Sequence, residues 1–295
     1  LRALGSPSRS LSMVTAATRI AQQPTEGRMG DMAVSTAGSQ LPTFLCVGAQ
    51  KAGTTTLHAL LSLHPEIYLP PQKELQYFSL HYAEGLEWYQ NCFAGASPSQ
   101  CIGEITPYYL FHPYVAERIA NDLGKIRIII LLRDPVARTL SHYAHAYRHG
   151  FETLPLEQAL AMEPSRLLEA DRVLKLSDGR HQQHQECSYL NRSLYRMQVQ
   201  RYWEYFGREN VLIFPCERLF SRPWKVLKEV FAFLNVSTIS KPSRSILRSH
   251  QNQGDSVRAD DFPANVSLST SFSCCVLIFL SRFLFYQFLL PYIFF

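Results

Sequence analysis

The fold of this chain is decided by the stretch Leu45-Cys46-Val47-Gly48-Ala49-Gln50-Lys51-Ala52-Gly53-Thr54-Thr55-Thr56-Leu57. The apolar run 44–47 predicts a buried strand, and residues 57–63 predict a helix that ends before Pro65. The loop between them contains two glycines and three threonines. The N–H groups and the dipole at the start of such a helix favour a bound anion. The stretch therefore predicts a phosphate-binding loop.

The order of residues in this loop separates it from the loop of nucleoside triphosphatases. In their motif, G-x-x-x-x-G-K-[ST], the lysine follows the last glycine. Here Lys51 precedes Gly53, and Thr54 stands at the position of that lysine. The order argues against a kinase that uses ATP and magnesium. An ordinary Gly/Thr turn before a helix is the other alternative for this stretch.

Length and composition limit the classes of function. The chain has 295 residues, 46% of them hydrophobic, which is enough for one large α/β domain or two small ones. A net charge of +5 suits an anionic ligand. The sequence contains no zinc-finger or RNA-binding motif and no C-x-x-C, so neither nucleic acid nor a metal is expected. Cys92 and Cys101 either form a disulfide or are two unrelated thiols.

Composition changes along the chain predict its organisation. Residues 1–41 are expected to be a disordered leader, with a composition that also permits a transit peptide. The domain spans 42–236, and 237–271 is expected to be an irregular linker. The apolar tail 272–295 predicts a transmembrane segment and hence membrane association. A buried helix or an altered chain end is the alternative for this tail.

Strands and helices are predicted to alternate within the domain. Residues 126–132 are expected to form the central strand of the sheet, residues 189–206 a long helix, and 164–186 an irregular polar loop in which His181 and His184 are solvated. Other strands are predicted at 66–69 and 211–214, and other helices at 86–93, 113–123, 136–148, 155–162 and 224–234. This alternation predicts an α/β fold with a doubly wound, mostly parallel sheet and helices on both faces.

Three further motifs accompany the loop. They are Lys73-Glu74-Leu75-Gln76-Tyr77-Phe78, then Leu132-Arg133-Asp134-Pro135 with Ser141 eight residues after the arginine, and Leu190-Asn191-Arg192-Ser193-Leu194-Tyr195. Together with the loop, they make residues 42–236 resemble the sulfotransferases that use 3′-phosphoadenosine 5′-phosphosulfate (PAPS). The likeness is closest to the heparan sulfate (carbohydrate) type and its bacterial relatives, and it implies a P-loop-like version of the predicted fold.

The resemblance implies how PAPS is held. It places the phosphosulfate on the loop residues Lys51, Ala52, Gly53, Thr54, Thr55 and Thr56, the 3′-phosphate on Arg133 and Ser141, and Tyr195 against the nucleotide. A guanidinium can pair with phosphate in a bidentate manner, and α/β sheets bind ligands at the carboxyl ends of their strands. The alternatives are that Arg133 pairs with Asp134 on the surface and that Tyr195 belongs only to an amphipathic helix.

The resemblance also assigns catalytic and acceptor-binding roles. Lys51 would stabilise the departing phosphate, and Glu74 would be the base that deprotonates the acceptor. Lys73 and Arg192 would bind the acceptor, and no metal would be needed. The acceptor is expected to be a hydroxyl or amine of a carbohydrate, with a protein tyrosine or a small alcohol as the alternatives. In the alternative, Glu74 is a surface carboxylate paired with Lys73.

Two departures from the family pattern support a rival hypothesis. Ile105 stands where many members have a lysine, and no Lys/Arg-Gly loop that would close over the nucleotide follows residue 236. The nearest basic cluster is Lys241-Pro242-Ser243-Arg244. The rival is a catalytically impaired domain, with an incomplete PAPS pocket, that binds a nucleotide or a sulfated glycan.

The expected location is a membrane such as that of the Golgi. Glycosylation sequons begin at Asn191, Asn235 and Asn265.

Overall fold

A computed structural model of the chain describes residues 40–249. The predicted leader up to residue 39, most of the predicted linker and the whole predicted tail lie outside this range. Among residues 40–249, no helix is both long enough and apolar enough to span a bilayer.

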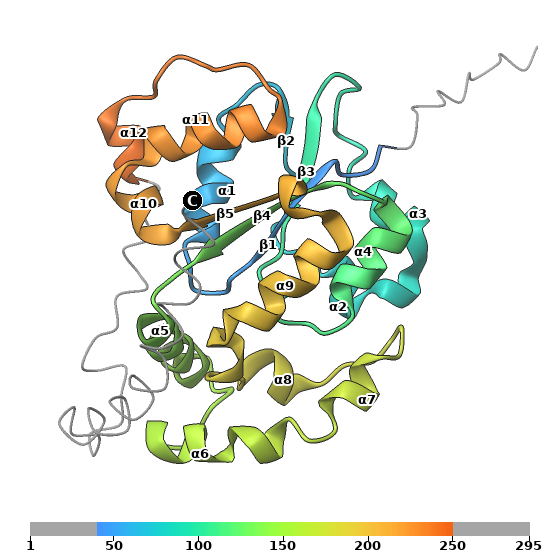
Figure 1. Cartoon of the computed structure of the whole chain (residues 1–295), viewed down its shortest axis with the longest axis vertical. Helices are drawn as coiled ribbons and strands as arrows, with labels where there is room; N and C mark the ends of the chain where they lie inside the picture. Colours follow the sequence, from blue (N-terminus) through green and yellow to red (C-terminus); the bar gives the residue numbers. More distant parts are fainter. Residues whose placement is uncertain (1–39, 250–295) are drawn as a thin grey trace, which may run out of the picture. The chain divides into compact units, whose positions relative to one another are not determined.

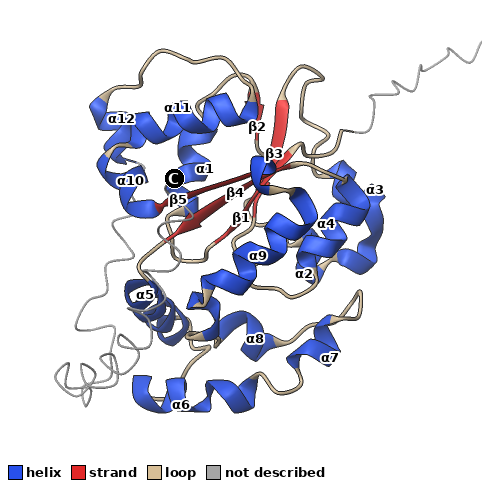
Figure 2. Cartoon of the chain, in the orientation of Figure 1, coloured by secondary structure: helices blue, strands red, loops and turns tan. Residues whose placement is uncertain are grey.

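Five parallel strands form one sheet in the order β2-β3-β1-β4-β5 (Figures 1 and 2). The strands are β1 (Phe44–Gly48), β2 (Ile67–Tyr68), β3 (Cys101–Ile105), β4 (Arg127–Leu132) and β5 (Val211–Pro215). The predicted parallel α/β sheet is confirmed. The middle position belongs to β1, however, and the β-branched run that was expected at the centre forms the neighbouring strand β4.

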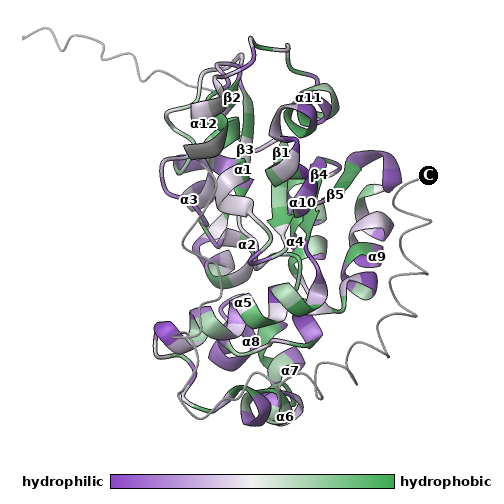
Figure 3. Ribbon diagram, turned by 90° about the vertical axis from the view of Figure 1, so that its left-hand side faces the viewer, coloured by the Kyte–Doolittle hydropathy of each residue, from purple (hydrophilic) through white to green (hydrophobic). Residues whose placement is uncertain are grey.

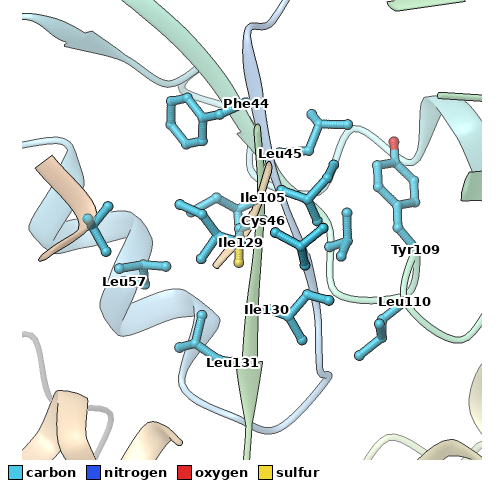
Figure 4. Close-up of a cluster of buried hydrophobic side chains, with 14 of the residues drawn as sticks. Phe44, Leu45, Cys46, Leu57, Ile105, Tyr109, Leu110, Ile129, Ile130 and Leu131 are labelled. Atoms are coloured by element: carbon cyan, nitrogen blue, oxygen red, sulfur yellow. The ribbon is translucent and has the colours of Figure 1, made fainter. Parts of the chain in front are cut away.

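The middle of the sheet is covered on both faces. Every residue of β1 is buried, as are Ile128–Leu131 of β4. Figure 4 shows Leu57 on one side of these strands and Tyr109 on the other, and the apolar colour in Figure 3 follows β1, β4 and β5. Burial on both faces explains why these strands are continuous apolar runs rather than alternating patterns.

The strand β3 was not predicted, although it lies between β2 and β1. It contains Gly103 and Glu104, which interrupt the apolar pattern expected of a buried strand. Gly103 pairs with Phe44 across the sheet, and a Cβ at this position would clash with the ring of Phe44. The glycine is therefore needed for packing.

Twelve α-helices are described among residues 40–249. They are α1 (Thr54–Leu61), α2 (Tyr77–Leu80), α3 (Gly85–Asn91), α4 (Val115–Leu123), α5 (Pro135–Arg148), α6 (Leu156–Arg166), α7 (Ala170–Leu174), α8 (Gln182–Glu186), α9 (Tyr195–Phe206), α10 (Cys216–Ser221), α11 (Pro223–Leu234) and α12 (Arg244–Ser249). Three 3₁₀ turns, η1 (Tyr82–Glu84), η2 (Asn191–Ser193) and η3 (Arg208–Asn210), complete the elements of this range.

Three stretches differ from the sequence-based expectation. The segment 164–186 is not an irregular solvated loop, because it contains α7 and α8 and because His184 is buried with Nδ1 2.8 Å from the hydroxyl of Tyr108. The helix expected from residue 189 begins only at Tyr195, since Leu194 has a ψ of 72° that no helix allows. Within the segment expected to be irregular after 236, α12 forms a short helix. Cys92 and Cys101 are free thiols.

Candidate active site

A cavity of about 740 Å³ lies where β1, β3 and β4 end. Its lining comes from the loop after β1 and the start of α1, the segment before α2, the loop after β3, the residue after β4, and helices α5 and α10. The lining residues are Gln50, Lys51, Gly53, Thr54, Thr55, Lys73, Glu74, Pro107, Arg133, His145, Arg148, His149 and Phe220. The carboxyl edge of an open parallel sheet is where α/β folds bind their ligands.

The loop after β1 forms one wall of this cavity. Lys51 has a φ of 68°, and Gly53, at the N-cap of α1, has a φ of 85°. A Cβ at Gly53 would lie 2.8 Å from the ring of Phe220, so glycine is needed both for its conformation and for this close approach. Thr54 and Thr55 line the cavity, whereas Ala52 and Thr56 are buried and do not.

Arg133 connects β4 to this loop. Its Nη1 donates to the backbone carbonyl of Lys51 at 3.0 Å. The neighbouring Asp134 caps α5, because its Oδ1 accepts from the backbone N–H of Ala137 at 2.8 Å. Asp134 therefore has a helix-capping role of its own, and the half-buried Arg133 side chain lines the cavity.

Two buried hydroxyls near the cavity lack protein partners. Ser141 is 1% exposed and so is Thr56, and neither hydroxyl oxygen has a hydrogen-bond partner in the described part of the chain. Buried polar atoms are nearly always paired in folded proteins. Ser141 lies on α5, one or two turns before His145, Arg148 and His149, which line the cavity. An unpaired hydroxyl at this position fits a bound anion that supplies the missing partner.

Lys73 and Glu74 form an ion pair at the rim of the cavity. The Lys73 Nζ lies 2.6 Å from Glu74 Oε1 and donates to Thr55 Oγ1 at 3.1 Å. In the alternative to a catalytic role, Glu74 was expected to pair with Lys73 on the surface. This ion pair is present, but both residues line the cavity. Glu74 has a φ of 60°, which is rare for a non-glycine residue. Strained backbone of this kind is often found at functional sites.

A buried carboxylate supports the segment that carries Glu74. Glu104 on β3 is 1% exposed and accepts from Thr106 Oγ1 at 2.5 Å and from the hydroxyls of Tyr89 and Tyr109. Burial raises the pKa of Glu104 above its ordinary value, and its hydrogen-bond donors offset only part of this rise. The hydroxyl of Tyr109 also accepts from the backbone N–H of Phe78 at 3.2 Å, which ties Glu104 to the segment that follows Glu74.

Two of the predicted contact residues, Arg192 and Tyr195, do not line the cavity. Arg192 is 1% exposed, and its guanidinium donates to the carbonyls of His184 and Gln185 and to the side chain of Gln50. It is used within the fold and does not line the cavity, but it positions Gln50, which does. Tyr195 is buried and donates to the backbone carbonyl of Arg133 at 3.0 Å, so it supports the end of β4 rather than lining the cavity.

Sequence reasoning missed six of the lining residues: Gln50, Pro107, His145, Arg148, His149 and Phe220. The α5 residues had a detectable signal, because His145, Arg148 and His149 follow Ser141 at spacings of four, seven and eight, which is one face of a helix. Phe220 had none, since it is brought to the cavity by the unpredicted helix α10.

Residues 41–256 match the family model described as the sulfotransferase domain. The chain belongs to the sulfotransferase family. A sulfotransferase from Alicyclobacillus acidocaldarius has 34% sequence identity, and its structure superposes with a TM-score of 0.60 over 69% of this chain and 85% of that one. The sulfotransferase fold of this chain therefore agrees with an experimentally determined one.

Curated relatives cover parts of this sulfotransferase domain. Heparan sulfate glucosamine 3-O-sulfotransferase 5 from Mus musculus is 29% identical over 202 residues, which cover 67% of this chain and 54% of that enzyme. The membrane-associated sulfotransferase kil1 from Dictyostelium discoideum is 42% identical over 106 residues, which cover 35% of this chain and 22% of that protein. The chain thus spans about half of the mouse relative and about a fifth of the other.

Proposed function

We propose that this chain transfers a sulfuryl group from PAPS to a hydroxyl or amine of a carbohydrate. One observation carries the proposal: Lys51, Glu74 and Arg133, from three separate motifs, line a single cavity. The family match and the heparan sulfate relatives support the reaction class and the type of acceptor.

The donor fits the polar groups around the cavity. Residues Lys51–Thr55 would hold the 5′-phosphosulfate at the start of α1, where N–H groups and the helix dipole attract an anion. Arg133 would pair with the 3′-phosphate, and the unpaired hydroxyl of Ser141 would donate to the same group. The ring of Phe220, which lies against Gly53, offers a flat surface on which the adenine ring of PAPS could stack.

In the reaction that we propose, PAPS supplies the sulfuryl group and 3′-phosphoadenosine 5′-phosphate is the other product. Glu74 accepts the proton of the acceptor hydroxyl as the new S–O bond forms. Lys51 stabilises the negative charge on the phosphate oxygen as the old S–O bond breaks. Lys73, paired with Glu74 in the free protein, neutralises the carboxylate until an acceptor displaces it.

The acceptor would enter between Glu74 and helix α5. Arg148 and His149 are exposed residues of the cavity lining and would contact carboxylate or sulfate groups of the acceptor, together with Lys73. Arg192 would act only indirectly, through Gln50. None of the described residues after 236 lines the cavity, so the missing Lys/Arg-Gly loop has no counterpart among them. We also propose a membrane location such as the Golgi, in line with the membrane-associated relative and the apolar sequence 272–295.

A transfer assay with radiolabelled PAPS against heparan-type glycans, neutral glycans, peptides and small alcohols tests this function. We expect labelled product with an anionic glycan, and we expect Lys51→Ala to reduce the rate by about 100-fold or more. Lys228→Ala, at an exposed lysine of α11, is the matched control and should retain full activity.

Calorimetry with 3′-phosphoadenosine 5′-phosphate separates the proposal from its rival. Binding without transfer to any acceptor would favour a domain that binds nucleotide without turnover. Failure to bind would reject both the enzyme and the nucleotide-binding hypothesis.

A further inference from the structure

Two of the sequons lie in the described part of the chain, and their environments differ. Asn191 is half-buried, its Nδ2 donates to Glu163 Oε1 at 2.9 Å, and the next two residues, Arg192 and Ser193, are each 1% exposed. A sugar on Asn191 Nδ2 would leave one hydrogen for the contact with Glu163 and would crowd the buried residues that follow. Asn191 is therefore a less accessible acceptor than an exposed asparagine.

Asn235 has the opposite environment. It is exposed, and it ends α11 with a φ of 56°, a left-handed conformation that asparagine tolerates better than most residues. Asn-x-Ser/Thr sequons that carry glycans lie on the surface of secreted proteins. A glycan on this side chain would extend into solvent without displacing a packed group.

The location of Asn235 also separates it from the cavity. The preceding residue, Leu234, accepts through its carbonyl from Arg127 Nη1 at 3.2 Å, and Arg127 begins β4. The cavity lies at the other edge of the parallel sheet, where β4 ends next to Arg133. Figure 1 shows the end of α11 beside β2, away from α5. A glycan at this edge would leave the cavity open.

The hydroxyl residue of this sequon has a role in the fold. Ser237 donates its hydroxyl to Glu66 Oε1 and its backbone N–H to Glu66 Oε2 at 2.9 Å, and its carbonyl accepts from His64 Nε2 at 2.8 Å. A glycosylating enzyme needs access to both the asparagine and the hydroxyl residue. Ser237 is itself exposed, so the sequon stays on the surface while Ser237 contacts Glu66.

We propose that Asn235 is an N-glycosylation site and that Asn191 is not, an inference that rests on the proposed membrane-enclosed location. In this modification, a bond forms between Asn235 Nδ2 and the anomeric carbon of an oligosaccharide carried on a lipid pyrophosphate. The bond from that carbon to the pyrophosphate oxygen breaks, the lipid pyrophosphate leaves, and Nδ2 loses one proton.

The test uses the full chain, preceded by a cleavable secretion signal, in a eukaryotic cell line. The third sequon is removed by Asn265→Gln so that only Asn191 and Asn235 remain. We expect a gel-mobility shift that an N-glycosidase reverses, that persists in Asn191→Gln and Ser237→Thr, and that disappears in Asn235→Gln. Asn235→Gly is the second variant, since glycine adopts the left-handed conformation without strain.

A shift that persists in both Asn235 variants, or no shift in the Asn265→Gln background, would overturn the proposal. The transfer assay is run on the same preparations, and we expect equal rates with and without the glycan. A chain that is glycosylated but inactive would reject the proposed function alone, whereas an active chain without the glycan would reject the glycosylation site alone.

Discussion

The cavity and the helical layer formed by residues 156–193 use their charged groups in opposite ways. In the helical layer, Glu163 is fully buried and accepts from the backbone N–H groups of Tyr189, Leu190 and Asn191, and Arg192 donates to two backbone carbonyls. On α5, near the residues that line the cavity, the hydroxyl of Ser141 is buried and has no hydrogen-bond partner within residues 40–249. A buried charged residue whose hydrogen bonds are all made to protein groups has a structural role. A buried polar atom that lacks a protein hydrogen bond and lies beside a cavity indicates a ligand site.

The largest effect is expected for Glu74→Gln at the cavity. The variant removes the proposed base but keeps nearly the same shape, so transfer should slow by about 1,000-fold while binding of 3′-phosphoadenosine 5′-phosphate stays unchanged. Single-turnover transfer and calorimetry measure the two quantities. Glu84→Gln, at an exposed glutamate, is the control. A normal rate in Glu74→Gln would show that the carboxylate is not the base.

Arg192→Met tests the structural role of the helical layer. The variant leaves buried carbonyls without donors, so the free energy of unfolding should fall by about 3 kcal/mol. Urea denaturation measures this change, with Arg196→Met as a matched control at an exposed position. If stability were unchanged and only the KM for the acceptor rose, Arg192 would be an acceptor-binding residue after all.

Acid should destabilise the protein through its buried histidines. Burial lowers the pKa of His184 to about 2 and that of His112 to about 3, below the ordinary value of 6.5. The unfolded chain therefore binds more protons below pH 6.5, and stability falls as the pH drops. Because of these two histidines, the free energy of unfolding should fall by about 2 kcal/mol between pH 7 and pH 5.5.

His184→Asn isolates this dependence on pH. Asparagine can keep a contact with the hydroxyl of Tyr108 but does not titrate, so the loss of stability between pH 7 and pH 5.5 should shrink by about 1 kcal/mol. His149→Asn, at an exposed position, is the comparison variant, and urea unfolding at the two pH values is the measurement. An unchanged pH dependence in His184→Asn would contradict a buried neutral imidazole.

Arg133→Ala should have a smaller effect that depends on the ligand. Affinity for 3′-phosphoadenosine 5′-phosphate should fall about 20-fold, since one charge-assisted contact is lost. Affinity for adenosine 5′-phosphate, which lacks the 3′-phosphate, should change little. Calorimetry with both nucleotides makes the comparison, and Arg208→Ala is the exposed control. An equal loss of affinity for both nucleotides would show that Arg133 stabilises the loop through its contact with the Lys51 carbonyl and does not bind the 3′-phosphate.

The smallest effect is expected for Ser141→Ala. The free protein should be as stable as before or slightly more stable, because the hydroxyl that is removed has no partner among the residues that the structure describes. Nucleotide affinity should fall less than tenfold. Thermal melts with and without nucleotide, beside Ser165→Ala as the exposed control, measure both quantities. A marked loss of stability in the free protein would show that the hydroxyl has a structural role.

Sequence predicted the parts of the molecule in which local pattern and tertiary role agree. The apolar runs of β1 and β4 and the order of Lys51 and Gly53 are local signals, and both led to the carboxyl edge of the sheet. The sequence did not show that the guanidinium of Arg192 donates its hydrogen bonds to the carbonyls of His184 and Gln185, because such contacts depend on packing between segments. The strand β3 was missed for a similar reason, since its glycine makes sense only beside Phe44.

The parallel strand β5 has a consequence for the order in which the chain can fold during synthesis. Its residue Val211 pairs with Ile128 of β4, and Ser237 contacts Glu66 across 171 residues of sequence. Domains form largely from the N-terminus as the chain emerges, and distant contacts form late. One edge of β4 therefore stays uncovered on the ribosome until the last part of the domain has been made. A chaperone that recognises exposed apolar strands would have this edge as its target.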